Sequence, residues 1–223
     1  MSNTVSWTQE AWKAAESIYN DIINHPFIKE LAAGTLSSGR FDRYLAQDEL
    51  YVGNYGRQMF ELAELITDPQ QHDMISEFAR EGIEGEKAMH ALLIDRFGID
   101  TEVPPSAITA DYNSHTQSAI ATGSKEIGLA AMLPCMWVYN EVGLHILRIA
   151  STEGNPYREW IQEYGNDAFT EGVNSVLKLA DAYAAATDEA TRRRMTEEYI
   201  EATRYEYFFW DYGYYGIDRR PER

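Results

Sequence analysis

Apolar side chains recur every three to four residues along most of the chain, the spacing that lines one face of an α-helix. Trp12, Ala15, Tyr19 and Ile22 follow this spacing near the N-terminus. Apart from short ambiguous runs, no segment shows the alternation of a β-strand. The pattern predicts helices over residues 5–24, 40–67, 69–97, 106–122, 124–150 and 167–186, a last long helix after 187–189, and short helical pieces up to residue 34 and over 157–164.

Turn and capping residues separate these helical blocks. Asp68 followed by Pro69 is typical of a helix start, and Gly98 of a helix end. His25 stands before Pro26 at a break, and we expect it to cap or bridge that break rather than ligate haem, because no basic residues follow to hold the propionates. The sequence therefore predicts an all-α bundle, a single domain over residues 1–223 with a polar tail from about residue 216.

Charge narrows the classes of partner. The formal net charge is −17 at pH 7. Nucleic acids and anionic membranes bind basic surfaces, so neither is an expected partner, whereas a small neutral or cationic ligand suits this field. The polar N-terminus does not resemble a signal peptide, no uncharged apolar run is long enough to span a membrane, and a single cysteine is compatible with a reducing compartment. We therefore expect a cytoplasmic protein.

The only cysteine lies in the unusual stretch Leu133–Gly143. Cys135 directly follows Pro134, which inside a helix removes the hydrogen bond to the carbonyl of Ala130. Tyr139 is four residues further on, so its phenol shares a helix face with the thiol. Two interpretations stay open: Cys135 is a small buried hydrophobe, or it is a nucleophile that needs a nearby acid or base.

Two acidic residues stand among aromatic ones. Asp48 shares a helical stripe with Tyr51 and Tyr55, where a carboxylate is costly unless hydrogen-bonded. Such an aspartate either binds a ligand or is satisfied by the tyrosines. Glu206 lies in the aromatic segment 204–212, and desolvation there would raise its pKa and make it a proton donor. The alternative for Glu206 is a solvated carboxylate at the end of the bundle.

Metal chemistry is a rival interpretation. Glu86 with His90, and Glu141 with His145, each place a carboxylate and an imidazole one turn apart on a helix. Di-iron oxidases on helical scaffolds use such pairs, although with a spacing of three residues rather than four. Both glutamates fit equally well as supports for another site.

Several separated segments together resemble the TenA/thiaminase II family. The resemblance runs in order through nearly the whole chain and rests on 25–27, 47–51, 133–143, 164–167 and 205–210. It implies a haem-oxygenase-like helical fold without haem, metal or other cofactor, a homotetramer, and hydrolysis of aminopyrimidines in thiamin salvage. The substrate would be 4-amino-5-aminomethyl-2-methylpyrimidine, with thiamin itself as a further possibility; the alternatives are a di-iron oxidase and a pyrimidine-binding protein without catalysis.

The resemblance also implies residue roles. Cys135 would add to the pyrimidine ring as nucleophile, Glu206 would donate a proton, and Tyr51 would bond the sulfur. Asp48 would hold the ring nitrogen and the exocyclic amine. The remaining substrate-binding residues that it implies are Tyr139, Tyr112, Tyr164 and Phe209, of which Tyr112 lies in the weakest matching segment.

Overall fold

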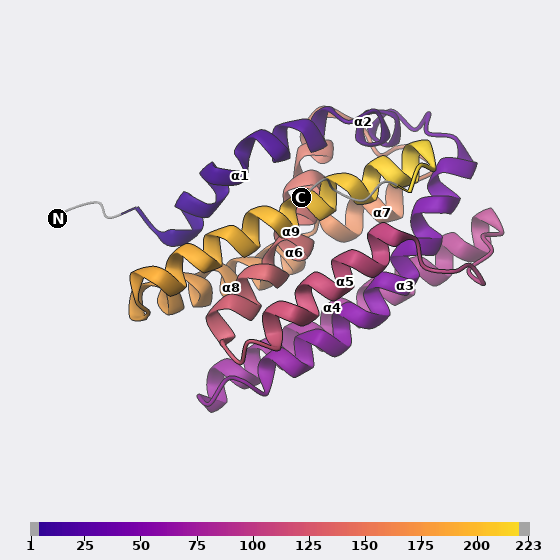
Figure 1. The fold of residues 1–223 in the computed structure, drawn as a ribbon. Helices are drawn as coiled ribbons and strands as arrows, with labels where there is room; N and C mark the ends of the chain where they lie inside the picture. Colours follow the sequence, from indigo (N-terminus) through magenta and orange to yellow (C-terminus); the bar gives the residue numbers. More distant parts are fainter. Residues whose placement is uncertain (1–4, 219–223) are drawn as a thin grey trace.

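The computed structural model describes residues 5–218, and all regular structure within this range is helical (Figure 1). Long helices lie side by side, with α3 against α4 and α6 against α9, as the all-α prediction requires. The elements are α1 (Trp7–Asn24), α2 (Pro26–Ala32), α3 (Ser38–Ala63), α4 (Pro69–Phe97), α5 (Ala107–Ile120), α6 (Lys125–Ile149), α7 (Arg158–Tyr164), α8 (Asp167–Ala186) and α9 (Glu189–Tyr215).

The capping residues act largely as the sequence predicts. Asp68 accepts hydrogen bonds from the first-turn amides of α4, and Gly98 ends that helix in the left-handed conformation at φ 66°. His25 caps α2 by accepting from the amide of Phe27 at 3.1 Å, so the predicted cap is confirmed. One boundary is wrong: α3 ends at Ala63 rather than near residue 67, because short-range backbone bonds turn the chain so that Asp68 can cap α4.

Helix α6 is the centre of the fold. It packs against α9, α5, α7 and α8 (Figure 1). By length and composition it could cross a membrane, with a mean hydropathy of 1.3 over its most apolar window, yet 78% of that window is buried within the protein. Pro134 lies inside α6 without ending it. The apolar character of α6 is therefore that of a core helix.

Gly143 allows α6 to touch α7 backbone to backbone. A Cβ atom at Gly143 would lie 2.7 Å from the amide nitrogen of Gly165, closer than real Cβ contacts. Nearby, the Asn140 side chain donates to the carbonyl of Tyr164 at 2.9 Å. This approach seats Tyr164 beside Tyr139, with ring centroids 4.8 Å apart.

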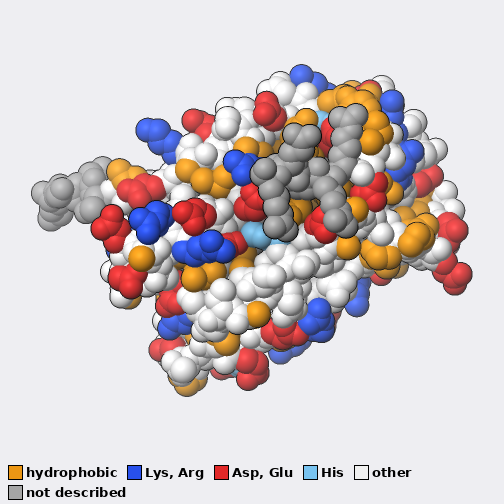
Figure 2. All heavy atoms as spheres, in the orientation of Figure 1, with side chains coloured by type: hydrophobic (Ala, Val, Ile, Leu, Met, Phe, Trp, Pro, Cys, Tyr) orange, Lys and Arg blue, Asp and Glu red, His pale blue; other side chains and the backbone are white. Residues whose placement is uncertain are grey.

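Charged side chains of both signs are mixed on the face shown in Figure 2, where basic groups stand among acidic ones without merging into one basic patch. Over the whole sequence acidic side chains outnumber basic ones, which gives the net charge of −17. A uniformly basic binding surface is therefore missing from this face of the described residues.

Candidate functional site

A cavity between α3, α4, α6, α7 and α8 brings several of the predicted site residues together. It holds about 600 Å³ of space between atoms, its mouth included. Asp48 lies in its wall together with Cys135, although 87 residues separate them in sequence (135 − 48). Other walls are Tyr55, Gly56, Met59, Phe78, Ala79, Gly82, Ile83, Glu86, Met136, Tyr139, Glu163, Tyr164 and Phe169.

Asp48 is buried and anchored through one of its two oxygens. The Tyr44 hydroxyl, one turn earlier on α3, donates to Asp48 Oδ2 at 2.9 Å. The Trp160 indole N–H in turn donates to the Tyr44 hydroxyl oxygen at 3.2 Å. The Tyr139 hydroxyl lies 3.2 Å from Tyr44. Asp48 is thus satisfied by a neighbouring tyrosine and also faces the cavity, and its ligand-binding role stays a prediction.

Cys135 faces the cavity and not a sealed apolar interior. Burial raises the pKa of its thiol well above the usual value, and the charges of Glu206 and Glu86 raise it further. The Tyr51 hydroxyl acts in the opposite direction and lowers the pKa. The resting sulfur is therefore a neutral thiol, and a nucleophilic role requires that it lose its proton when a substrate is present.

Glu206 on α9 is buried, only 2% exposed. Burial raises its pKa to about 8, the charges of Asp48 and Glu86 add to this, and a hydrogen bond from Tyr112 opposes it. That bond, from the Tyr112 hydroxyl to Glu206 Oε1, is 2.6 Å long. Glu206 therefore holds a proton at neutral pH, and the solvated alternative from the sequence is wrong.

Aromatic rings lie between Glu206 and Tyr44. Tyr51 stacks on Tyr112 at 4.8 Å and lies 5.9 Å from Phe209. Phe209 in turn meets the Tyr44 ring edge-on at 5.7 Å. The Tyr51 hydroxyl is buried and has no partner of ordinary hydrogen-bond geometry among the described residues. Tyr51, Tyr112, Phe209 and Glu206 are not among the residues that line the cavity as it stands.

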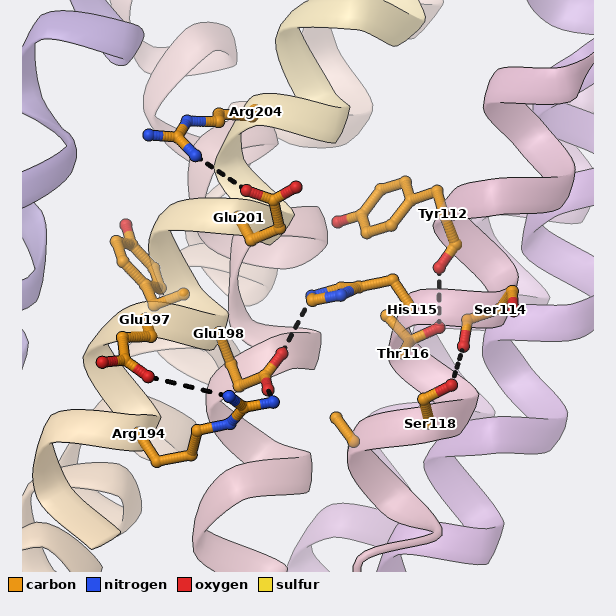
Figure 3. Close-up of polar contacts among 12 residues, drawn as sticks. Tyr112, Ser114, His115, Thr116, Ser118, Arg194, Glu197, Glu198, Glu201 and Arg204 are labelled. Atoms are coloured by element: carbon orange, nitrogen blue, oxygen red, sulfur yellow. Dashed lines mark hydrogen bonds and ion pairs between the residues drawn. The ribbon is translucent and has the colours of Figure 1, made fainter. Parts of the chain in front are cut away.

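Near Tyr112, His115 of α5 contacts Glu198 of α9, which pairs with Arg194 of the same helix (Figure 3). His115 Nε2 lies 3.2 Å from Glu198 Oε2, and Arg194 reaches the other oxygen of Glu198 at 2.5 Å. The Tyr205 ring packs against both the His115 and the Tyr112 rings, at centroid distances of 5.4 and 5.2 Å. These contacts join the two helices that carry Tyr112 and Glu206.

Among residues 5–218, Asp48, Glu86 and His90 form a cluster that could hold a cation, since their ligand atoms all lie within 4.8 Å of one another. However, His90 already pairs both ring nitrogens with carboxylates, of Asp48 and Glu49. Glu86 accepts from the Tyr164 hydroxyl, and burial raises its pKa to about 7. The second pair from the sequence, Glu141 and His145, forms no such cluster within residues 5–218.

Sequence reasoning missed several contacts of the site. Trp160 was not among the candidates, although its indole donates to Tyr44 beneath Asp48. Tyr55, named only as part of the stripe, lines the cavity and donates to the carbonyl of Met132 at 3.1 Å. The spacing of Tyr44 one turn before Asp48 could have indicated their hydrogen bond. No sequence pattern indicates that α7, which carries Trp160, approaches Tyr44.

Comparison with known proteins agrees with this geometry. The sequence model described as the TENA/THI-4/PQQC family matches residues 12–216. This chain belongs to that family. The resemblance to TenA proteins, and the haem-oxygenase-like fold that it implied, are therefore confirmed.

Individual relatives cover nearly the whole chain. The aminopyrimidine aminohydrolase of Bacillus subtilis is 30% identical over 215 residues, spanning 94% of this chain and 90% of the relative. A thiamine biosynthesis multifunctional protein, ThiED, of Corynebacterium efficiens is 30% identical over 92% of this chain and 28% of its own length. Among solved structures, a TenA homologue from Pyrococcus furiosus matches at a TM-score of 0.88 with 24% identity, covering 93% of this chain and 100% of that one. A haem-oxygenase-like domain from Shewanella denitrificans matches at 0.71 with 14% identity, covering 99% of this chain and 100% of that one.

Proposed function

We propose that this protein is a cysteine-dependent hydrolase of aminopyrimidines that acts in thiamin salvage, with 4-amino-5-aminomethyl-2-methylpyrimidine as substrate and the 5-hydroxymethyl compound and ammonia as products. The observation that carries the proposal is the meeting of Cys135 and Asp48 in one aromatic-walled cavity. The names of the family relatives, aminopyrimidine aminohydrolase and ThiED, support the substrate class.

The chemistry of an aminopyrimidine suits these groups. The ring is flat and electron-poor, so it packs on aromatic faces, and its N–H groups can bond the Asp48 carboxylate. Glu206 does not line the cavity as it stands, but its charge acts on Cys135 in the cavity wall. It holds a proton at neutral pH and would protonate a ring nitrogen. Protonation makes a ring carbon electrophilic enough for the Cys135 sulfur to add.

The proton of the thiol needs an acceptor, and we assign that role to Glu86. Its carboxyl shares the cavity with Cys135, and its pKa of about 7 allows it to take and return a proton. Sulfur addition leaves a neutral adduct, whose electron pair expels the amine from the exocyclic methylene as ammonia, with the proton from Glu86.

Water then adds to the methylene carbon and gives its proton to Glu86. In the last step the sulfur leaves with the proton of Glu86, and the ring nitrogen returns its proton to Glu206. Both acids and the thiol regain their starting state, and the net change is exchange of the amine for a hydroxyl.

Replacement of the sulfur tests the proposal directly. We expect Cys135→Ser to abolish ammonia release from 4-amino-5-aminomethyl-2-methylpyrimidine, measured by a coupled ammonia assay, while the 5-hydroxymethyl product still binds by calorimetry. Unchanged turnover in Cys135→Ser would refute cysteine dependence. If the wild-type protein binds the pyrimidine but converts none, the protein is a binding protein without catalysis.

We also propose a homotetramer in the cytoplasm, as the family resemblance implies. Apolar side chains on the surface support self-association: Leu92, Leu147 and Ile149 are 45%, 40% and 60% exposed. Sedimentation equilibrium tests the assembly, because a species of 25.5 kDa would be a monomer and would contradict it.

A further inference from the structure

His90 on α4 lies between two carboxylates that both belong to α3. Its Nδ1 is 2.7 Å from Glu49 Oε2, and its Nε2 is 3.3 Å from Asp48 Oδ2. The ring is fully buried, and Asp48 is only 2% exposed. Glu49 lies further out, with 35% of its side chain exposed, and it is not a wall of the cavity. The imidazole therefore links a carboxylate of the cavity to one outside it.

Two carboxylates on one imidazole fix the form of the ring. An ionised carboxylate only accepts hydrogen bonds, and a neutral imidazole has only one N–H to donate. With an acceptor at each nitrogen, both contacts are hydrogen bonds only if the ring is an imidazolium. The charges agree: burial lowers the pKa of His90, but Asp48, Glu49 and Glu86 outweigh it and raise the pKa to about 10.

The other charged side chains near His90 are mostly carboxylates, so the imidazolium lies in negatively charged surroundings. The Glu86 carboxyl lies one turn before His90 on the same helix, and Lys87 is close enough to Glu49 to lower the pKa of that carboxyl. The charged groups that act on His90 are Asp48 and Glu49 of α3 and Glu86 of α4. The groups that act on these partners in turn are Tyr44 of α3, Lys87 of α4, and Glu163 and Tyr164 of α7.

This arrangement leaves one oxygen of Asp48 open. The Tyr44 hydroxyl and His90 both bond Oδ2, at 2.9 and 3.3 Å. Within residues 5–218, no group bonds Oδ1, and Asp48 is a wall of the cavity. One oxygen is thus anchored to the protein, and the other is free to accept from a ligand.

We propose that His90, held by Glu49, is a positioning residue for substrate recognition: it fixes the side chain of Asp48 so that Oδ1 is presented to an N–H group of the aminopyrimidine. This inference rests on the proposed function, because Asp48 is there the group that binds the ring. His90 itself is not a catalytic residue, since it acts only through Asp48.

Two variants separate the proposal from a merely structural role. His90→Gln keeps one donor toward Asp48 but loses the charge and the second donor. Glu49→Gln leaves the cavity wall untouched and removes the carboxylate that holds the outer nitrogen. We expect KM to rise on the order of ten- to a hundredfold in His90→Gln, because the contact with Asp48 loses its charge and the hydrogen bond to the charged Glu49 is lost, and less in Glu49→Gln, with a smaller change in kcat. Glu61→Gln, on the same helix but paired with the surface Arg57, is the matched control and should match wild type.

A spectroscopic measurement tests the arrangement without relying on turnover. In protein labelled with ¹⁵N-histidine, NMR at about pH 8 should show two N–H groups on His90, because its pKa is about 10, and a single one in Glu49→Gln. One N–H on His90 in the wild type would overturn the proposal, as would a KM within twofold of wild type in a folded His90→Gln. If the wild type releases no ammonia, the proposed function fails instead, and calorimetry with the 5-hydroxymethyl pyrimidine then decides: weaker binding to His90→Gln supports the positioning role, and equal binding refutes it.

Discussion

Removal of the Tyr112 hydroxyl, which donates to Glu206, tests the predicted pH dependence of activity. Burial raises the pKa of Glu206 to about 8, and the Tyr112 bond lowers it. Tyr112→Phe keeps the ring that stacks on Tyr51 but removes the donor at 2.6 Å. Without that donor the carboxylate loses stabilisation relative to the acid, so the pKa rises. A hydrogen bond to a buried charge contributes about 1.5–3 kcal/mol, which corresponds to about one to two pKa units.

The assay is kcat/KM for ammonia release between pH 6 and 10, because this ratio reports the groups of the free enzyme. Glu206 acts as an acid, so wild-type activity should fall as pH rises through about 8. In Tyr112→Phe this alkaline limb should move to higher pH. Tyr183→Phe is the matched control, since that hydroxyl donates to Gln71 in the first turn of α4 and not to Glu206. An alkaline limb that stays in place, or moves to lower pH, would refute the assignment of Glu206 as the acid held by Tyr112.

Three further outcomes follow from the same contacts. Glu206→Gln should lower kcat about a hundredfold or more at pH 7 and abolish the alkaline limb, with Glu201→Gln on the same helix as control; a loss below threefold would assign the proton to another group. Glu86→Gln should lower kcat on the order of a hundredfold in the ammonia assay, and full activity would remove Glu86 from the proton path. Gly143→Ala should lower the free energy of unfolding in urea by about 1–3 kcal/mol, because its Cβ would lie 2.7 Å from backbone atoms. Gly53→Ala, with nothing within 4 Å of its Cβ, is the control and should be neutral or stabilising. Equal stabilities of the two variants would contradict the close approach of α6 to α7.

The helices could be predicted from the sequence because their apolar spacing and their capping residues are local in the chain. Spacing within one helix also linked Asp48 to its neighbours on α3, and the bond from Tyr44 is of this kind. The end of α3 was less predictable, since the apolar pattern continues past Ala63 while the backbone has already turned. Local patterns thus fix helices and pairs one turn apart.

Contacts between distant helices were a different matter. Tyr112 and Glu206 are 94 residues apart, and only the family resemblance placed them in one site. Spacing also suggested that Glu86 and His90 form a pair, and their ligand atoms do lie within 4.8 Å of each other, but the hydrogen bonds of His90 go to two carboxylates of α3. The register of α4 against α3 decides between these partners, and no periodicity in either helix encodes it.

The cluster of acids around the cavity also couples ligand binding to protons. Glu86 and Glu206 have pKa values of about 7 and 8 because a charge on each is opposed by burial and by neighbouring carboxylates. A positively charged guest relieves that repulsion, so its arrival makes ionisation of these acids easier. The protein would then exchange a bound proton for a bound cation, and its affinity for such a guest would increase as the solution becomes less acidic, up to the point where the guest itself loses its charge.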